Sequence, residues 1–312
     1  ASTSVVVSVN NSLVCYGLNE FGSDFQKETY LKPLAAGSIH GAFCLSEPEA
    51  GSDAASIQTR SQKKKERWVV NGKKHFISDG AYSDFFVITA VTDPEQGHRG
   101  ISTFIIDKNT KGVTVGRNQP MMGLRGTSHV ELFFDEVQLG PEHLLGEEGL
   151  GLKMALETLG RIRLAQVCAR AVGKATKILE LSTDFARKRK QFGKTLDQFQ
   201  HIQTMLTDSA IEINAARLVV LQTAWETDQG KDVKARISMS KIQTSETLGK
   251  VADRGVQIFG GLGYCKDLSI ERYFRDSRIY RIYDGTSEIH RTVVAKALSK
   301  GETPLFQNPH NF

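Results

Sequence analysis

Three hydrophobic patterns follow one another along the chain, and each predicts a different kind of structure. Over residues 23–34 the apolar side chains recur at the spacing of one helical face. This spacing predicts an amphipathic helix within a short helical segment that covers residues 1–37.

A second pattern covers residues 38–148, where short apolar runs rich in β-branched residues alternate with turn residues. Residues 85–92 and 101–106 are two such runs, and the pair Asn71 and Gly72 is typical of a tight hairpin turn. This pattern predicts a β-barrel or sandwich of about 100 residues.

Helical spacing returns at residues 149–312. Leu159, Ile162, Ala165 and Ala169 recur at steps of three and four, and a later helix is expected from about Lys234 until the glycines that follow Phe259. We therefore predict an α+β multidomain protein, in which a central β-domain is followed by a C-terminal bundle of the four-helix type.

Composition and charge exclude several classes of protein. The 312 residues include 40 basic and 35 acidic ones, and this net charge of +5 is too dilute to indicate nucleic-acid binding. No apolar run approaches the roughly 18 residues that a membrane-spanning helix needs. The four cysteines are far apart in sequence and suggest neither a disulfide framework nor a zinc site, so we expect no metal and a reducing compartment. The first residues have no pattern of a secretion signal.

Four segments contain polar, aromatic or glycine residues that folding alone does not require. They are residues 45–53, 76–80, 189–193 and 257–264, the last followed by residues 280–289. Taken singly, each has an ordinary structural explanation: a turn, a core aromatic residue, a basic helix end and a weak candidate for a phosphate-binding loop.

Taken together, the segments resemble the acyl-CoA dehydrogenase family over nearly the whole chain. Residues 45–53 are similar to the family's [ST]EPxxGSD loop, and residues 189–193 and 257–263 are similar to its RxxFG and QxxGGxG segments. Residues 283–289 resemble the segment YEGTSxI, which supplies the catalytic base in that family.

The resemblance implies FAD as the cofactor. Leu45 and Ser46 match positions at the pyrimidine edge of the flavin, and Phe76 and Ser78 match positions near its reactive N5. Further matching positions bind the flavin of a neighbouring subunit or follow the base; here they are Arg189, Gln191, Phe192, Gln257, Gly260, Gly261, Thr286 and Glu288.

The implied reaction is the α,β-desaturation of an acyl-CoA thioester, with Asp284 as the base. Ser52, Arg161, Tyr283 and Gly285 match substrate-binding positions. The implied partners are an electron-transfer flavoprotein and further copies of the chain in a dimer or tetramer, in a bacterial cytoplasm or a mitochondrial matrix. Two alternatives stay open: an acyl-CoA oxidase-like flavoprotein that uses oxygen, and a catalytically weak member that acts as a binding or assembly scaffold.

The sequence departs from the family pattern at three places. Asp284 stands where most members have Glu, which withdraws the carboxylate by about 1.5 Å. A rival position for the base, just before Arg161, is occupied by Gly160, and Phe76 replaces the usual Trp. The resemblance also implies that residues 1–37 are the remnant of a longer N-terminal helical domain, so that either the chain is a fragment or a partner completes the acyl pocket.

Overall fold

The computed structural model describes residue 5 and residues 7–301, without the side chains of residues 11 and 161. The chain divides into two compact units, Ala1–Arg161 and Ile162–Phe312. We describe each unit by itself.

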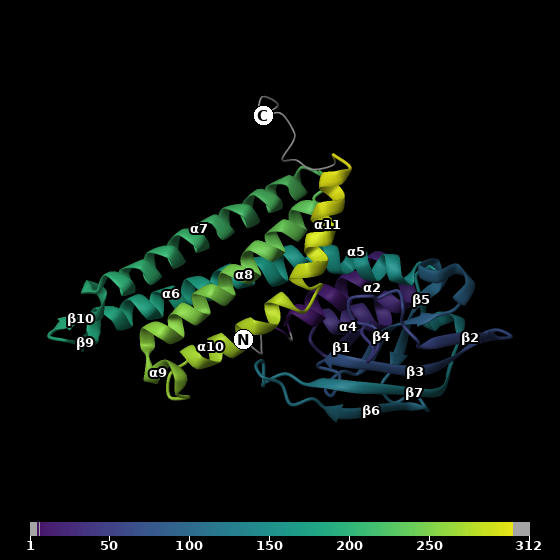
Figure 1. Cartoon of the computed structure of the whole chain (residues 1–312). Coiled ribbons are helices and arrows are strands. Elements are labelled where there is room, and N and C mark those ends of the chain that lie inside the picture. The colour runs from purple at the N-terminus through teal and green to yellow at the C-terminus, as the bar shows by residue number, and fades with distance from the viewer. Residues whose placement is uncertain (1–4, 6, 302–312) are drawn as a thin grey trace. The chain divides into compact units, whose positions relative to one another are not determined.

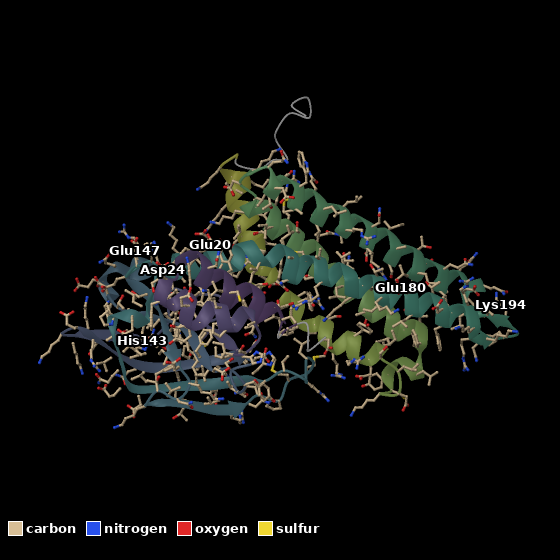
Figure 2. The ribbon with its side chains drawn as sticks, turned by 180° about the vertical axis from the view of Figure 1, so that it is seen from behind. Glu20, Asp24, His143, Glu147, Glu180 and Lys194 are labelled. Carbon is tan, nitrogen blue, oxygen red and sulfur yellow. The ribbon has the colours of Figure 1, made fainter. Side chains whose placement is uncertain are left out.

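Short helical segments begin the first unit (Figure 1). They are η1 (Val9–Val14), α2 (Cys15–Phe21), α3 (Asp24–Gln26), η2 (Lys27–Leu31) and α4 (Lys32–Ala35). The predicted helix over residues 23–34 is confirmed, and it starts where Ser23 and Gln26 form a reciprocal capping box. The buried Gln26 also donates to the carbonyls of Glu142 and Leu144, at 2.8 and 2.9 Å. Figure 2 labels Asp24 and His143 on the two segments that these bonds join.

An eight-stranded sheet forms the rest of this unit. Its strands are β1 (Gly41–Cys44), β2 (Arg60–Lys64), β3 (Arg67–Ser78), β4 (Phe85–Val91), β5 (Ile101–Asp107), β6 (Val113–Asn118), β7 (His129–Leu139) and β8 (Leu144–Leu145). Two short 3-10 helices, η3 (Pro94–Gly100) and η4 (Pro141–His143), lie between them. The strand order is β6-β7-β3-β2-β4-β5-β8, with β1 parallel to β4 at one side.

The structure corrects two sequence predictions for this domain. Among the described residues no pairing joins β6 to β8, so the sheet stays open and the barrel prediction is wrong. Asn71 and Gly72 lie inside β3, at a register shift, and do not form a hairpin turn. Gly72 has φ 149°, and a Cβ there would lie 2.6 Å from the Cα of Thr59, so the glycine allows a neighbouring strand end to come close.

The inner face of the sheet is mainly apolar. Its core includes Phe86, Ile88 and Phe104, and the ring of Phe104 meets that of Trp68 edge-on at 5.4 Å. Lys74 in β3 is also completely buried, and its Nζ lies 2.8 Å from Oε1 of Glu47, which is 3% exposed. Burying these two charges costs desolvation free energy, and removing either partner would leave an unpaired charge that is strongly unfavourable in an apolar surrounding.

Helices build the second unit. The helix α5 (Gly151–Arg163) ends at the start of this unit. It is followed by η5 (Leu164–Ala169), α6 (Arg170–Lys188), η6 (Leu196–Gln198), α7 (Gln200–Asp228), α8 (Lys234–Phe259), α9 (Gly261–Tyr264), α10 (Ile270–Arg278), η7 (Ile279–Arg281) and α11 (Ser287–Ser299). A two-stranded ribbon, β9 (Lys190–Gln191) and β10 (Lys194–Thr195), connects α6 to η6. The predicted bundle and the predicted helix over residues 234–259 are confirmed, and Gly260 ends that helix with φ 59°.

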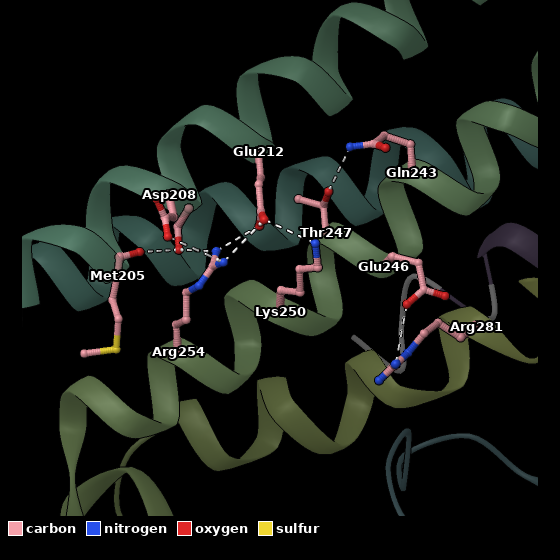
Figure 3. Close-up of polar contacts among 10 residues, drawn as sticks. Met205, Asp208, Glu212, Gln243, Glu246, Thr247, Lys250, Arg254 and Arg281 are labelled. Atoms are coloured by element: carbon pink, nitrogen blue, oxygen red, sulfur yellow. Dashed lines mark hydrogen bonds and ion pairs between the residues drawn. The ribbon is translucent and has the colours of Figure 1, made fainter. Parts of the chain in front are cut away.

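The helix α8 is the centre of the bundle, because it contacts α6, α7, α10 and α11. Leu248, Val251 and Ala252 from α8 belong to a buried core with residues of α6 and α7. Figure 3 shows a polar link on the solvent side: Arg254 of α8 lies 2.8 Å from Glu212 of α7, and Lys250 lies 3.3 Å from the same carboxylate. No helix in the described part of the chain is both long enough and apolar enough to cross a membrane.

The buried ion pair generates a prediction for stability. Glu47→Gln should lower the free energy of unfolding by about 3–5 kcal/mol, because it leaves the Lys74 charge buried without a counter-charge. The exposed Glu49 provides the control, and Glu49→Gln should change stability by no more than about 0.5 kcal/mol. Urea unfolding of both variants measures the difference, and a loss below about 1 kcal/mol for Glu47→Gln would contradict the assignment.

Candidate functional site

The loop after β1 is fixed to the sheet by its backbone and by Glu47. The carbonyl of Ser46 accepts a hydrogen bond from the backbone N–H of His75 at 2.9 Å. Nζ of Lys74 donates to the carbonyl of Leu45 and to Oγ1 of Thr89, both at 3.2 Å. The Glu47 carboxylate accepts the backbone N–H groups of Gln58 and Thr59. The predicted ligand positions Leu45 and Ser46 are therefore held against β3.

Burial and these contacts lower the pKa of both Glu47 and Lys74. Burial raises the pKa of Glu47, but the Lys74 charge and the donors at Thr59 and Gln58 outweigh burial and hold that pKa below its usual value. Burial lowers the pKa of Lys74, and the Glu47 carboxylate opposes this effect. The stabilisation by the carboxylate is present above the ordinary pKa of Glu and is lost as the pH falls through the lowered value. The loop should therefore stay anchored at neutral pH.

Phe76 does not have the geometry of a core residue. Its φ is 56°, a left-handed conformation that is uncommon for a bulky residue, and its side chain is 54% exposed. The ring stacks on that of His75, with centroids 4.0 Å apart. Within the described residues, the half-buried hydroxyls of Ser78 and Ser46 have no hydrogen-bond partner, so both can bind a ligand.

The two predicted CoA contacts of the first unit are less informative. Ser52 is exposed in the loop after β1, beside the hydrogen-bonded pair Asp53 and Ser56. The side chain of Arg161 lies outside the described residues.

In the second unit, one end of the bundle collects six predicted cofactor residues. Phe185 near the end of α6 stacks on Phe259 at the end of α8, with ring centroids 4.2 Å apart. This contact brings the segment after α6 to the segment after α8, as Figure 1 shows for β9, β10 and α9. The six predicted residues in these segments are all exposed: Arg189, Gln191, Phe192, Gln257, Gly260 and Gly261.

The exposed groups at this end suit an anionic, aromatic ligand. The Arg189 guanidinium has no hydrogen-bond or salt-bridge partner among the described residues, and Phe192 is 94% exposed in a turn with φ 50°. Figure 2 labels Lys194 in the same ribbon. A guanidinium and an aromatic ring exposed at one location can bind the phosphates and the ring of such a ligand.

The turn before α11 contains the predicted base. Asp284 and Gly285 have φ 53° and 89°, and the carbonyl of Asp284 accepts hydrogen bonds from Nε of Arg163 at 2.8 Å and from Nε2 of His290 at 3.1 Å. Lys241 Nζ donates to the carbonyl of Gly285 at 2.6 Å. The Asp284 carboxylate, which is half-buried, has no hydrogen-bond or ion-pair partner among the described residues.

Electrostatics leave this carboxylate unusually ready to take a proton. Burial raises the pKa of Asp284, and the charges of Arg163, Lys241 and Arg170 oppose that effect without cancelling it. The net shift is upward, which moves a carboxyl group toward the range in which it can act as a base near neutral pH.

The residues around Asp284 have structural duties that the sequence does not reveal. The hydroxyl of Tyr283, a predicted substrate contact, accepts a hydrogen bond from Arg170 at 2.9 Å. Thr286 caps α11 through its hydroxyl, which accepts the backbone N–H of Ile289 at 3.2 Å, whereas Glu288 is exposed. Gly285 is a glycine because a Cβ there would lie 2.9 Å from Nε2 of His290.

Sequence reasoning missed Arg163, Lys241 and His290. One signal was available for Lys241: it lies on the buried face of α8, at helical spacing from Ile237, Thr244 and Leu248. A lysine in such a series is rare unless it is paired or functional. Among the described residues, no three His, Cys, Asp or Glu side chains come together as metal ligands would.

Comparison with known protein families covers most of the chain. Residues 1–38, 42–137 and 149–299 match the models described as acyl-CoA dehydrogenase N-terminal, middle and C-terminal domain. The chain is 40% identical over 303 residues to "Acyl-CoA dehydrogenase" of Bacillus subtilis, covering 96% of this chain and 79% of that protein.

Solved structures give the same result. Butyryl-CoA dehydrogenase from Megasphaera elsdenii is 37% identical with a TM-score of 0.92, over 96% of this chain and 78% of that one. A chain described under "Electron transferring flavoprotein of Acidaminococcus fermentans" is 39% identical with a TM-score of 0.91, over 95% and 78% of the two chains. The family consists of FAD-dependent oxidoreductases of fatty acid β-oxidation, and tetramers are typical of it. On the sequence motifs, the fold and these matches, the chain belongs to the acyl-CoA dehydrogenase family.

Proposed function

We propose that the protein desaturates an acyl-CoA thioester between Cα and Cβ, and that Asp284 removes the α-proton. The observation that carries the proposal is the half-buried Asp284 carboxylate, which has no partner among the described residues although both carbonyls of its turn accept hydrogen bonds. A general base needs an accessible lone pair and a pKa raised toward the working pH, and both conditions are met at Asp284.

The residues present fit FAD. The guanidinium of Arg189, which has no partner among the described residues, suits a pyrophosphate. The glycines after α8 leave open space, since nothing lies within 4 Å of a Cβ built at Gly260 or Gly261. Phe76 offers an exposed ring, and the hydroxyls of Ser46 and Ser78 are free to bond the polar edge of a flavin. Leu45 contributes backbone, while Gln191, Phe192 and Gln257 would complete the contacts at the bundle end.

The chemistry then divides between cofactor and chain. FAD, when bound, accepts the β-hydrogen as hydride. Asp284 holds the α-proton on its carboxylate, and Tyr283 stays protonated because burial and the nearby Tyr280 raise its pKa. Arg163 and Lys241 place positive charge beside the carboxylate without binding it, so its basicity is moderated and not abolished.

We infer the substrate and the electron acceptor from the similar proteins, as part of this proposal. Butyryl-CoA dehydrogenase is among the similar structures, which supports a short acyl chain as substrate. The Acidaminococcus fermentans match supports an electron-transfer flavoprotein as the acceptor. An oxidase would instead reduce oxygen, so the rate of flavin reoxidation in air separates the two alternatives.

The surface of α7 supports an oligomer. Ile211, Leu218, Leu221 and Trp225 are between 49% and 63% exposed. Residues seven apart share a helix face, so Ile211, Leu218 and Trp225 form an apolar stripe that a second copy of the chain would cover.

The first functional prediction concerns the base. Asp284→Asn should reduce the anaerobic rate of flavin bleaching by acyl-CoA by about 10²–10⁴-fold, because the amide cannot accept the α-proton. Substrate affinity should stay near that of the wild type, since the amide is almost isosteric. Asp253→Asn, an exposed change on α8, serves as the control. Bleaching at a near wild-type rate in Asp284→Asn would mean that another group removes the proton.

A lengthened base tests whether the turn is built for aspartate. Asp284→Glu moves the carboxylate by about 1.5 Å, and because the turn is fixed the bleaching rate should fall by about 10²-fold. Stopped-flow absorbance measures it for butyryl-CoA and a longer acyl-CoA. A rate that rises with straight chains would show that the pocket is shaped for the longer side chain.

The cofactor contact at the bundle end is tested with Arg189. Arg189→Ala should release FAD on gel filtration while the free energy of unfolding of the flavin-free chain stays unchanged, because the guanidinium has no partner within its own unit. Lys190→Ala, which removes the neighbouring exposed cation, should retain the flavin. Monomers that keep one FAD per chain would contradict binding across a subunit interface.

A further inference from the structure

The turn at Asp284 and Gly285 is a strained piece of backbone. Two successive residues adopt left-handed φ values, 53° and 89°, and one of them is not glycine. Aspartate tolerates this region better than most residues, but the conformation persists only where surrounding contacts determine it.

Three donors from three separate segments supply those contacts. Arg163 ends α5, Lys241 lies in the middle of α8 and His290 lies in the first turns of α11. All three bind the two carbonyls of the turn, at 2.8, 2.6 and 3.1 Å respectively, and none binds the carboxylate.

His290 fills this role as a neutral ring at pH 7. Its Nε2 faces a carbonyl, which accepts only, so Nε2 carries the hydrogen, and its Nδ1 lies 3.1 Å from the Ser238 hydroxyl. Burial, with the charge of Arg163, lowers the pKa of His290 to about 4, so the ring is neutral at pH 7. The imidazole therefore adds a donor to the turn but no charge.

Lys241 adds both a donor and a charge. It is completely buried, and the groups that face it are Asp284, Arg163, Cys168 in η5 and Glu246 on its own helix. Burial lowers the pKa of Lys241 to about 8, so most of the population is charged at pH 7. Burying a lysine against a backbone carbonyl costs desolvation free energy, and Lys241 forms no salt bridge with the described residues that would offset it.

We infer that Lys241, Arg163 and His290 are positioning residues for the base: they bind the backbone of the Asp284 turn so that its carboxylate is held in place yet left free. The inference rests on the proposed role of Asp284. It adds that Lys241 keeps the base deprotonated to lower pH than burial alone would allow, because its positive charge favours the carboxylate.

The main test is Lys241→Met in the FAD-loaded protein, which keeps the length of the side chain and removes donor and charge. We expect kcat to fall by about 10–100-fold and KM to change much less, because a misplaced base slows the proton transfer more than it weakens substrate binding. We also expect the acid limb of the pH dependence of kcat to move to higher pH, because Asp284 loses a stabilising cation. Lys250→Met, which changes an exposed lysine of the same helix, should alter neither quantity.

Hydrogen exchange gives a readout that does not depend on catalysis. The amides of Tyr283 and Ile289 flank the turn and donate to Ile279 and to Thr286. In Lys241→Met both should exchange at least about tenfold faster, with the core of α8 unchanged. A loss of activity with an unmoved acid limb and unchanged exchange would overturn the inference, and so would faster exchange throughout the bundle.

A matched pair at His290 keeps the test valid if Lys241→Met does not fold. His290→Gln retains an N–H donor that can reach the Asp284 carbonyl, whereas His290→Leu has a similar size and no donor. Only the leucine variant should show the loss of kcat and the faster exchange, and equal behaviour of the two variants would overturn the inference. If Asp284→Asn proves active, the proposed base is wrong, but the exchange results still decide whether the three residues hold the turn.

Discussion

Backbone carbonyls buried without a helix or strand partner must find other donors, and the turn at Asp284 depends on this requirement. The chain reverses there in a left-handed conformation that leaves two carbonyls facing the interior of the bundle. Arg163, Lys241 and His290 satisfy them. Because these donors come from α5, α8 and α11, the position of one carboxylate depends on the packing of three helices.

In the first unit, too, a buried polar group is stabilised by partners from separate segments, but here the group is a charge and not a carbonyl. Lys74 is a buried charge inside an apolar sheet, and it is tolerated because Glu47, the Leu45 carbonyl and Thr89 surround it. The result is a rigid connection between the loop at residues 45–53 and the strand that bears Phe76. The strained backbone at Phe76 is then tolerated, because hydrogen bonds hold the residues on both sides of it.

In both units, the groups that hold the backbone are thus distinct from the exposed groups that we propose as ligand contacts. Lys74 and Lys241 are completely buried and serve the frame, whereas Phe76, Arg189 and Phe192 are exposed. The frame sets where the Cα lies, and the side chain then sets how far the carboxylate reaches.

The sequence by itself determined the family, the order of a helical segment, a β-domain and a helix bundle, and the candidate base, because these depend on local periodicity and on short motifs with fixed spacing. Only the tertiary structure decided that Asn71 and Gly72 stay inside a strand, since the close approach of Thr59 overrides the local turn preference. The same holds for the open sheet and for Arg163, Lys241 and His290. Hydrogen bonds between residues as far apart as 163 and 284 leave no trace in local patterns, and only the packed helices bring such donors to the same turn.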